Sequence, residues 1–84
     1  MQVTKFGFTY TADLHGMTVE SARRELVRLL NSCPKEITEV EVIHGQHGGT
    51  ALMNMIRREF KHPRLERKIL GLNGGMTTLV LKKQ

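Results

Sequence analysis

The chain has 84 residues, 39% of them hydrophobic and 25% charged, a balance typical of a folded globular protein rather than a disordered one. A chain of this length fits one domain, so we expect residues 1–84 to form a single unit and to be monomeric. The lone cysteine, Cys33, excludes an internal disulfide and a cysteine zinc cluster. No apolar run approaches the roughly 20 residues that span a bilayer, and the amino terminus does not resemble a signal peptide. We therefore expect a cytoplasmic protein without a membrane partner.

The net charge of +5 is unevenly distributed along the chain. Residues 1–52 carry five Lys or Arg against six Asp or Glu, a net charge of −1. Residues 53–84 carry eight Lys or Arg against two Glu, a net charge of +6. Such asymmetry favours a polyanionic partner. Solubility alone is the alternative explanation, and charge by itself does not separate the two.

The first third of the chain predicts a strand, a turn and a helix. Apolar and polar residues alternate over residues 2–13, which predicts one half-buried strand whose apolar side chains are Phe6, Phe8, Tyr10 and Ala12. Gly16 marks a turn, and Thr18 is a suitable helix N-cap. Apolar residues then recur at three- and four-residue steps until Pro34 stops the helix.

The remainder predicts a further strand, a helix and two closing strands. The β-branched segment 39–43 predicts a strand, and a second helix runs from near Thr50 to His62-Pro63. Strands are expected over 65–72 and 77–82, with a turn at Asn73-Gly74-Gly75 between them. The order β-α-β-α-β-β predicts a two-layer α/β sandwich, a four-stranded mixed sheet with two helices. The pattern leaves open whether both helices cover one face.

Three residues are candidates for chemistry. Asp13, the only aspartate, and His15 follow the first predicted strand, and His44 follows the second. Because ligands of open α/β sheets bind outside the carboxyl ends of strands, these side chains could converge. A carboxylate with imidazoles can hold a metal or transfer protons near neutral pH. The alternative is structural, with Asp13 capping the turn and His15 packed in a loop.

Two further features could bind phosphate. Glycines and a helix start favour an anion in the loop after His44, which contains Gly45, His47, Gly48 and Gly49. This loop is neither a Walker motif nor a dinucleotide fingerprint, and a plain tight turn explains it as well. A basic cluster, opposed only by two glutamates, comprises Arg57, Arg58, Lys61, Arg64, Arg67 and Lys68. Such residues neutralise nucleic-acid phosphates, although a solvated helix face is the alternative.

Three motifs together resemble the small MutS-related (Smr) domain family. Asp13-Leu14-His15-Gly16 resembles its LDLHG turn, which leads into a helix containing Glu and Ala, and Val42-Ile43-His44-Gly45 resembles the start of its HGxGxG turn. Residues 74–81 resemble its final strand, which begins with Gly-Gly. His47 stands where the second motif has its middle glycine, and Thr77 stands where the final motif has its third. The match extends over nearly the whole chain.

The resemblance implies a sheet with two helices, similar to the C-terminal domain of translation initiation factor three. It also implies nucleic-acid binding and, as in several members, nicking or RNA-cleaving endonuclease activity. Asp13 and His15 match the first motif, and His44 and Gly45 the second. Asp13 is then a base or metal ligand, and both histidines are acid–base groups or phosphate contacts. The sequence does not decide whether a divalent cation takes part.

The leading hypothesis is therefore a DNA- or RNA-binding domain with endonuclease activity. One alternative is a non-catalytic module for branched or single-stranded nucleic acid. Another is a protein-interaction adaptor whose basic surface is incidental, which would make other proteins its partners.

Overall fold

A computed structural model describes residues 1–45, 50–71 and 74–83. It contains a mixed sheet in the order β1-β2-β3-β5-β4, in which β2 and β3 are parallel and every other pair is antiparallel. The strands are β1 (Gln2–Phe6), β2 (Thr9–Asp13), β3 (Glu39–Ile43), β4 (Leu65–Leu70) and β5 (Met76–Leu81). The expected mixed α/β fold is confirmed. Leu72 and Asn73, placed by the sequence in a strand and a turn, lie outside the described residues.

The strand count differs from the expected four because residues 2–13 form a hairpin and not one strand. Gly7 adopts a φ of 61°, which glycine accepts readily, and the chain reverses there so that Phe6 pairs with Thr9. The reversal breaks the assumed alternation, because Phe6 pairs with Thr9 and so lies on the face opposite to Tyr10, while Phe8 lies in the turn. Phe6 is 90% exposed and Phe8 65% exposed, whereas Tyr10 packs against the core.

Two helical segments complete the fold. Helix α1 (Val19–Ser32) begins at Thr18, whose hydroxyl accepts a hydrogen bond from the backbone N–H of Ser21 at 3.1 Å. It buries Ala22, Leu26 and Leu30. Helix α2 (Ala51–Asn54) continues into a π-helical turn, η1 (Met55–Glu59). There the backbone N–H of Phe60 donates to the carbonyl of Met55 at 2.7 Å, the wider spacing that defines a π-turn.

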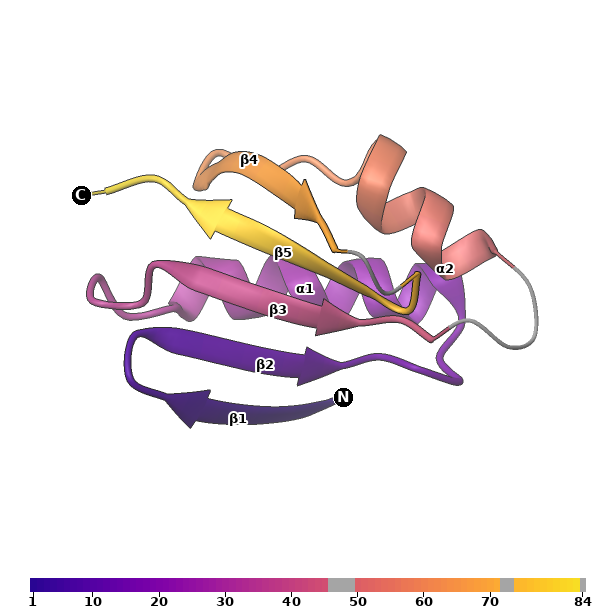
Figure 1. The fold of residues 1–84 in the computed structure, drawn as a ribbon, viewed down its shortest axis with the longest axis horizontal. Helices are drawn as coiled ribbons and strands as arrows, with labels where there is room; N and C mark the ends of the chain where they lie inside the picture. Colours follow the sequence, from indigo (N-terminus) through magenta and orange to yellow (C-terminus); the bar gives the residue numbers. More distant parts are fainter. Residues whose placement is uncertain (46–49, 72–73, 84) are drawn as a thin grey trace.

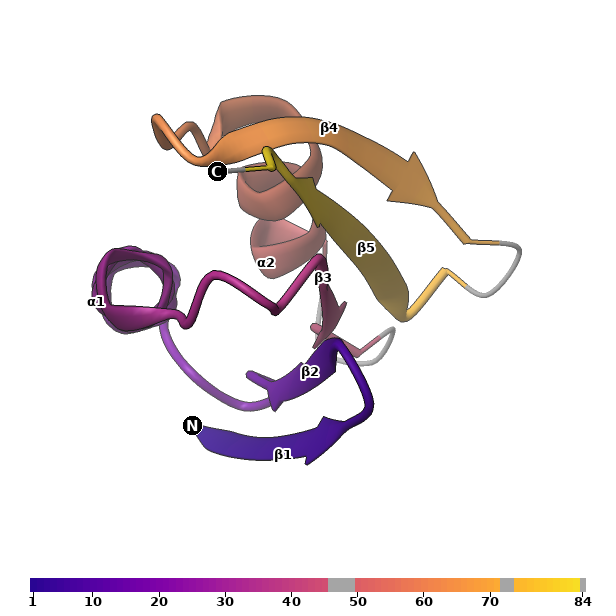
Figure 2. The same ribbon diagram turned by 90° about the vertical axis from the view of Figure 1, so that its left-hand side faces the viewer.

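Both helices cover the same face of the sheet, which answers the question that the sequence left open (Figures 1 and 2). The core lies between the two layers and includes Val40, Val42 and Leu79 from the sheet with Ile56 and Phe60 from the second helical segment. On the uncovered face, the outward residues of β3 and β5 are half-buried. No helix in the described parts of the chain is long and apolar enough to cross a membrane.

Candidate functional site at the carboxyl ends of β2 and β3

Strands β2 and β3 end side by side, as the sequence predicted. Asp13 pairs with Ile43, and the backbone N–H of Leu14 donates to the carbonyl of Ile43 at 2.8 Å. Gly16 and Gly45 have φ values of 80° and 81°, which a residue with a side chain rarely adopts. A Cβ on Gly45 would lie 3.4 Å from the Cβ of His15. The two His-Gly turns are therefore in contact, and we call residues 13–16 with 43–45 the carboxyl edge.

At this edge Asp13 and His15 form a close pair. The Nδ1 atom of His15 lies 2.6 Å from Oδ1 of Asp13, and the backbone N–H of His15 donates to the same oxygen at 3.1 Å. Both hydrogen bonds lower the pKa of the Asp13 carboxyl below its ordinary value, and the bond from the His15 ring has the larger effect. A carboxylate only accepts hydrogen bonds, so Nδ1 of His15 carries the proton.

The pairing leaves the other ring nitrogen of His15 to the solvent. The His15 side chain is 71% exposed. In the neutral ring held by Asp13, Nε2 has a lone pair that can accept a proton or bind a metal. Among the described residues no group of three His, Cys, Asp or Glu side chains is arranged to hold a metal ion. The edge thus offers a proton-transfer group with a fixed tautomer.

The side chain of His44 points elsewhere. Asp13 pairs with Ile43, and His44 comes one residue later, so the alternation of a strand turns it to the opposite, helix-covered face. It is only 4% exposed. Its Nε2 lies 3.0 Å from Oγ1 of Thr77, and its Nδ1 lies 3.2 Å from the carbonyl oxygen of Gly45. The structure therefore brings the Asp13 and His15 side chains together but directs the His44 ring away from them.

The environment favours the neutral form of His44. Burial lowers the pKa of its imidazole below the ordinary value; the hydrogen bond to the Gly45 carbonyl opposes this, and the positive charge of Arg57 adds to it. Arg57 is half-buried on η1, and its Nε donates to Oγ1 of Thr77 at 2.8 Å while its Nη2 donates to the carbonyl of Met76 at 3.1 Å. Sequence reasoning included Arg57 in the basic cluster but gave Thr77 no functional role. The sequence feature that could have drawn attention to Thr77 is that it is a hydroxyl residue in the place matched to the third glycine of the final motif.

Four members of the basic cluster line one shallow groove between η1 and the edge strand β4, which we call the basic groove. Its volume is about 420 Å³. The basic residues that line it are Arg58, Lys61, Arg67 and Lys68, and Glu66 is the one acidic residue. Burial, together with the charge of nearby Lys61, lowers the pKa of Lys68, as expected where cations gather. The predicted clustering of these four residues is present in the fold.

Arg64 does not belong to that surface, and its assignment to the phosphate-binding cluster is corrected. It is 7% exposed, and its guanidinium donates to the carbonyl oxygens of Cys33, of Pro34 at 2.9 Å and of Ile37 at 3.4 Å. These carbonyls belong to residues that follow α1, and the one of Pro34 also accepts from the backbone N–H of Ile37 at 3.1 Å. Arg64 therefore links the segment after α1 to the start of β4 through hydrogen bonds.

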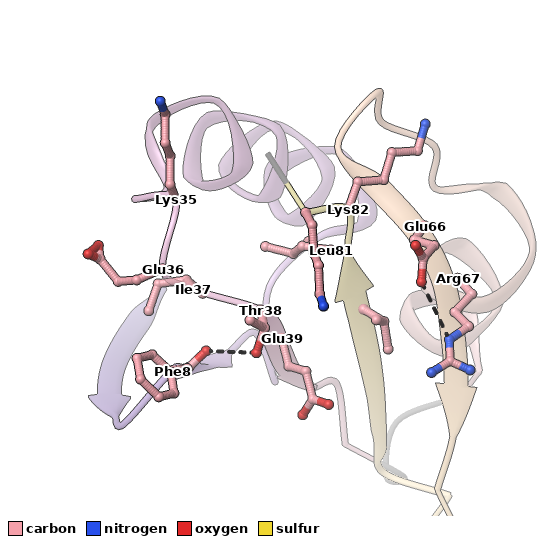
Figure 3. A pocket seen from close by; sticks show the side chains of 12 residues that line it. Phe8, Lys35, Glu36, Ile37, Thr38, Glu39, Glu66, Arg67, Leu81 and Lys82 are labelled. Carbon is pink, nitrogen blue, oxygen red and sulfur yellow. Dashed lines mark hydrogen bonds and ion pairs between the residues drawn. The ribbon is translucent and has the colours of Figure 1, made fainter.

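The remaining candidates are His47, Gly48 and Gly49, which lie outside the described residues. A wider groove, of about 760 Å³, lies at the opposite end of the sheet from the carboxyl edge (Figure 3). Its lining includes three glutamates, Glu36, Glu39 and Glu66, where the basic groove has one. This mixture of charge makes the wider groove a poorer match for phosphate than the basic groove.

The comparisons with known proteins fit this geometry. The crystal structure of the Smr domain of Thermus thermophilus MutS2 matches with a TM-score of 0.72 and 26% sequence identity, covering 86% of this chain and 96% of that one. A search of curated proteins found no match. The fold is a small two-layer α/β domain with two contacting His-Gly turns at the carboxyl ends of its parallel strands. The Smr domain family model matches residues 12–71, and the chain belongs to the Smr domain family, a class of nucleic-acid-binding and nuclease-type modules.

Proposed function

We propose that this Smr domain binds a nucleic-acid backbone and cleaves phosphodiester bonds at the carboxyl edge. The observation that carries the proposal is the Asp13–His15 pair, with an Nδ1–Oδ1 distance of 2.6 Å. This contact fixes the proton on Nδ1 and presents Nε2 of an exposed imidazole to a substrate. Orientation of a catalytic imidazole by a carboxylate is a recurring device for proton transfer.

His15 acts as the general base and Asp13 orients it. With RNA, Nε2 of His15 takes the proton of a 2′-hydroxyl while that oxygen bonds to phosphorus. The bond from phosphorus to the 5′-oxygen breaks, and the leaving oxygen takes a proton from the imidazolium or from water. With DNA, the same nitrogen takes a proton from the attacking water instead. If a divalent cation takes part, Nε2 of His15 is the exposed nitrogen that would hold it, while Asp13 orients the ring from Nδ1.

The basic groove holds the flanking backbone in this proposal. Arg58, Lys61, Arg67 and Lys68 gather positive charge at one place, and such a site neutralises successive phosphates. Contacts of this kind carry no sequence information, so binding depends on backbone charge and shape rather than on bases.

A non-catalytic binding module is the second candidate. It is favoured by the ring of His44, whose two nitrogens both have partners within the protein. Because both ring nitrogens of His44 are occupied, the Asp13–His15 pair is all that remains at the carboxyl edge for acid–base chemistry.

The test combines binding and cleavage on the same substrates. End-labelled RNA, single-stranded DNA, duplex DNA and branched DNA are incubated with the domain, with and without Mg²⁺ or Mn²⁺. We expect salt-sensitive binding and the appearance of shortened products. Salt-sensitive binding without products under any metal condition supports the binding module. Failure to bind any of these substrates contradicts both candidates and leaves the protein-interaction adaptor.

A further inference from the structure

A single buried hydroxyl connects His44 to Arg57. Oγ1 of Thr77, which is fully buried, lies 3.0 Å from Nε2 of His44 and 2.8 Å from Nε of Arg57. Thr77 lies on β5 opposite Val42, two residues before His44, and Arg57 reaches it from η1. The hydroxyl thus joins the second His-Gly turn, the last strand and the π-helical turn.

The direction of each hydrogen bond in this chain follows from what each group can donate. Arginine has no acceptor, so Thr77 Oγ1 must accept from Arg57. The carbonyl oxygen of Gly45 only accepts, so Nδ1 of His44 carries a proton. A neutral His44 then has a bare Nε2, which accepts the hydroxyl proton of Thr77. Arg57 thus donates to Thr77, Thr77 donates to His44, and His44 donates to the carbonyl oxygen of Gly45.

The guanidinium of Arg57 is held along one edge. Its Nε donates to Thr77 and its Nη2 to the carbonyl of Met76, at 2.8 and 3.1 Å, so two bonds fix the plane of the group beside the start of β5. An arginine has five N–H donors, and these two bonds leave the Nη1 donors and one on Nη2. The backbone N–H groups of His44 and Gly45 donate to the carbonyl of Gly75 nearby, which ties the second His-Gly turn to the same strand end.

We propose that Thr77 is a positioning residue that acts with the Gly45 carbonyl to hold His44 in its Nδ1–H tautomer, and that orients Arg57 so that its remaining N–H donors meet a substrate phosphate. The phosphate contact rests on the proposed function, whereas the tautomer does not.

The first test is made on the protein without nucleic acid. Histidine side-chain ¹⁵N NMR reports which ring nitrogen carries the proton. We expect wild type to show His44 as Nδ1–H. Thr77→Val removes the hydroxyl at similar volume and should shift the Nε2 resonance of His44, because that nitrogen loses its donor while the Gly45 carbonyl still holds the proton on Nδ1. Thr77→Ser should restore the wild-type spectrum. An unchanged His44 spectrum in Thr77→Val, or a Thr77→Ser that behaves like Thr77→Val, overturns the proposal.

The second test measures binding of a fluorescent single-stranded oligonucleotide against salt. Loss of one phosphate contact should reduce the magnitude of the log–log salt slope by about 0.7. We expect that loss for Arg57→Gln, which removes the charge, and for Thr77→Val, which removes the bond that orients the guanidinium, and no loss for Thr77→Ser. Arg57→Gln tests the phosphate contact even if Thr77→Val does not fold. An Arg57→Gln slope equal to wild type overturns the phosphate contact, whereas a wild type that binds no oligonucleotide overturns the proposed function and leaves the tautomer result standing on its own.

Discussion

Replacing Arg58 and Arg67 with glutamine should weaken nucleic-acid binding in proportion to the phosphates released. The basic groove presents four cations, Arg58, Lys61, Arg67 and Lys68. If each neutralises one phosphate, the log–log salt slope is about −2.8 for a single strand and about −3.6 for a duplex. The double variant should bring the single-strand slope to about −1.4 and, at about 0.1 M salt, lower affinity roughly 25-fold, about fivefold for each lost contact.

Fluorescence anisotropy with labelled single strands and duplexes over a range of KCl concentrations measures both quantities. Arg24→Gln with Lys35→Gln is the matched control, because it removes the same two charges at exposed positions that do not line the basic groove. The control should keep a slope near that of wild type. Equal losses of affinity in both double variants would show that binding follows net charge alone. No loss of affinity in either variant would show that the basic groove does not contact phosphates.

Two further predictions concern stability. Arg64→Met should lower the free energy of unfolding by about 1–3 kcal/mol, because the partly buried carbonyls after α1 lose their charged donor. Urea denaturation measures the change, and an unchanged midpoint would contradict the role given to Arg64. The pKa values of His44 and His62 are both lowered from 6.5, chiefly by burial. Their imidazoles therefore become protonated at a lower pH in the folded chain than in the unfolded one. Stability should be full above pH 6.5, fall as the pH drops from 6.5 towards the lower folded pKa values, and level off below them. His44→Asn with His62→Gln should flatten that decline in urea titrations, and an undiminished decline would assign it to other groups.

The elements whose signals are local could be predicted from the sequence. The apolar spacing of α1, the N-cap at Thr18 and the β-branched run of β3 each depend on neighbouring residues, and all are present. The hairpin at Gly7 was missed because alternation of apolar residues continues through a two-residue turn while the strand changes direction. Period-two spacing alone does not distinguish a long strand from two short ones.

The candidate site was predicted in position but not in side-chain direction. Both His-Gly turns lie at one edge because β2 and β3 are parallel neighbours. The direction of His44, however, depends on a register in which Asp13 pairs with Ile43, and a shift of one residue would reverse it. The burial of Arg64 likewise depends on how the end of α1 meets the start of β4, a contact between residues 27–31 positions apart.

The most direct test of the Asp13–His15 pair is a comparison of cleavage by wild type, Asp13→Asn and His15→Gln. The asparagine keeps the shape and can still cap the turn, but it no longer fixes the proton on Nδ1 of His15. We predict that each variant cleaves labelled RNA or nicks plasmid DNA on the order of 10²–10⁴ times more slowly than wild type. Circular dichroism and anisotropy should show folding and binding unchanged. An Asp13→Asn protein that is folded, binds, and cleaves as fast as wild type would contradict the central claim.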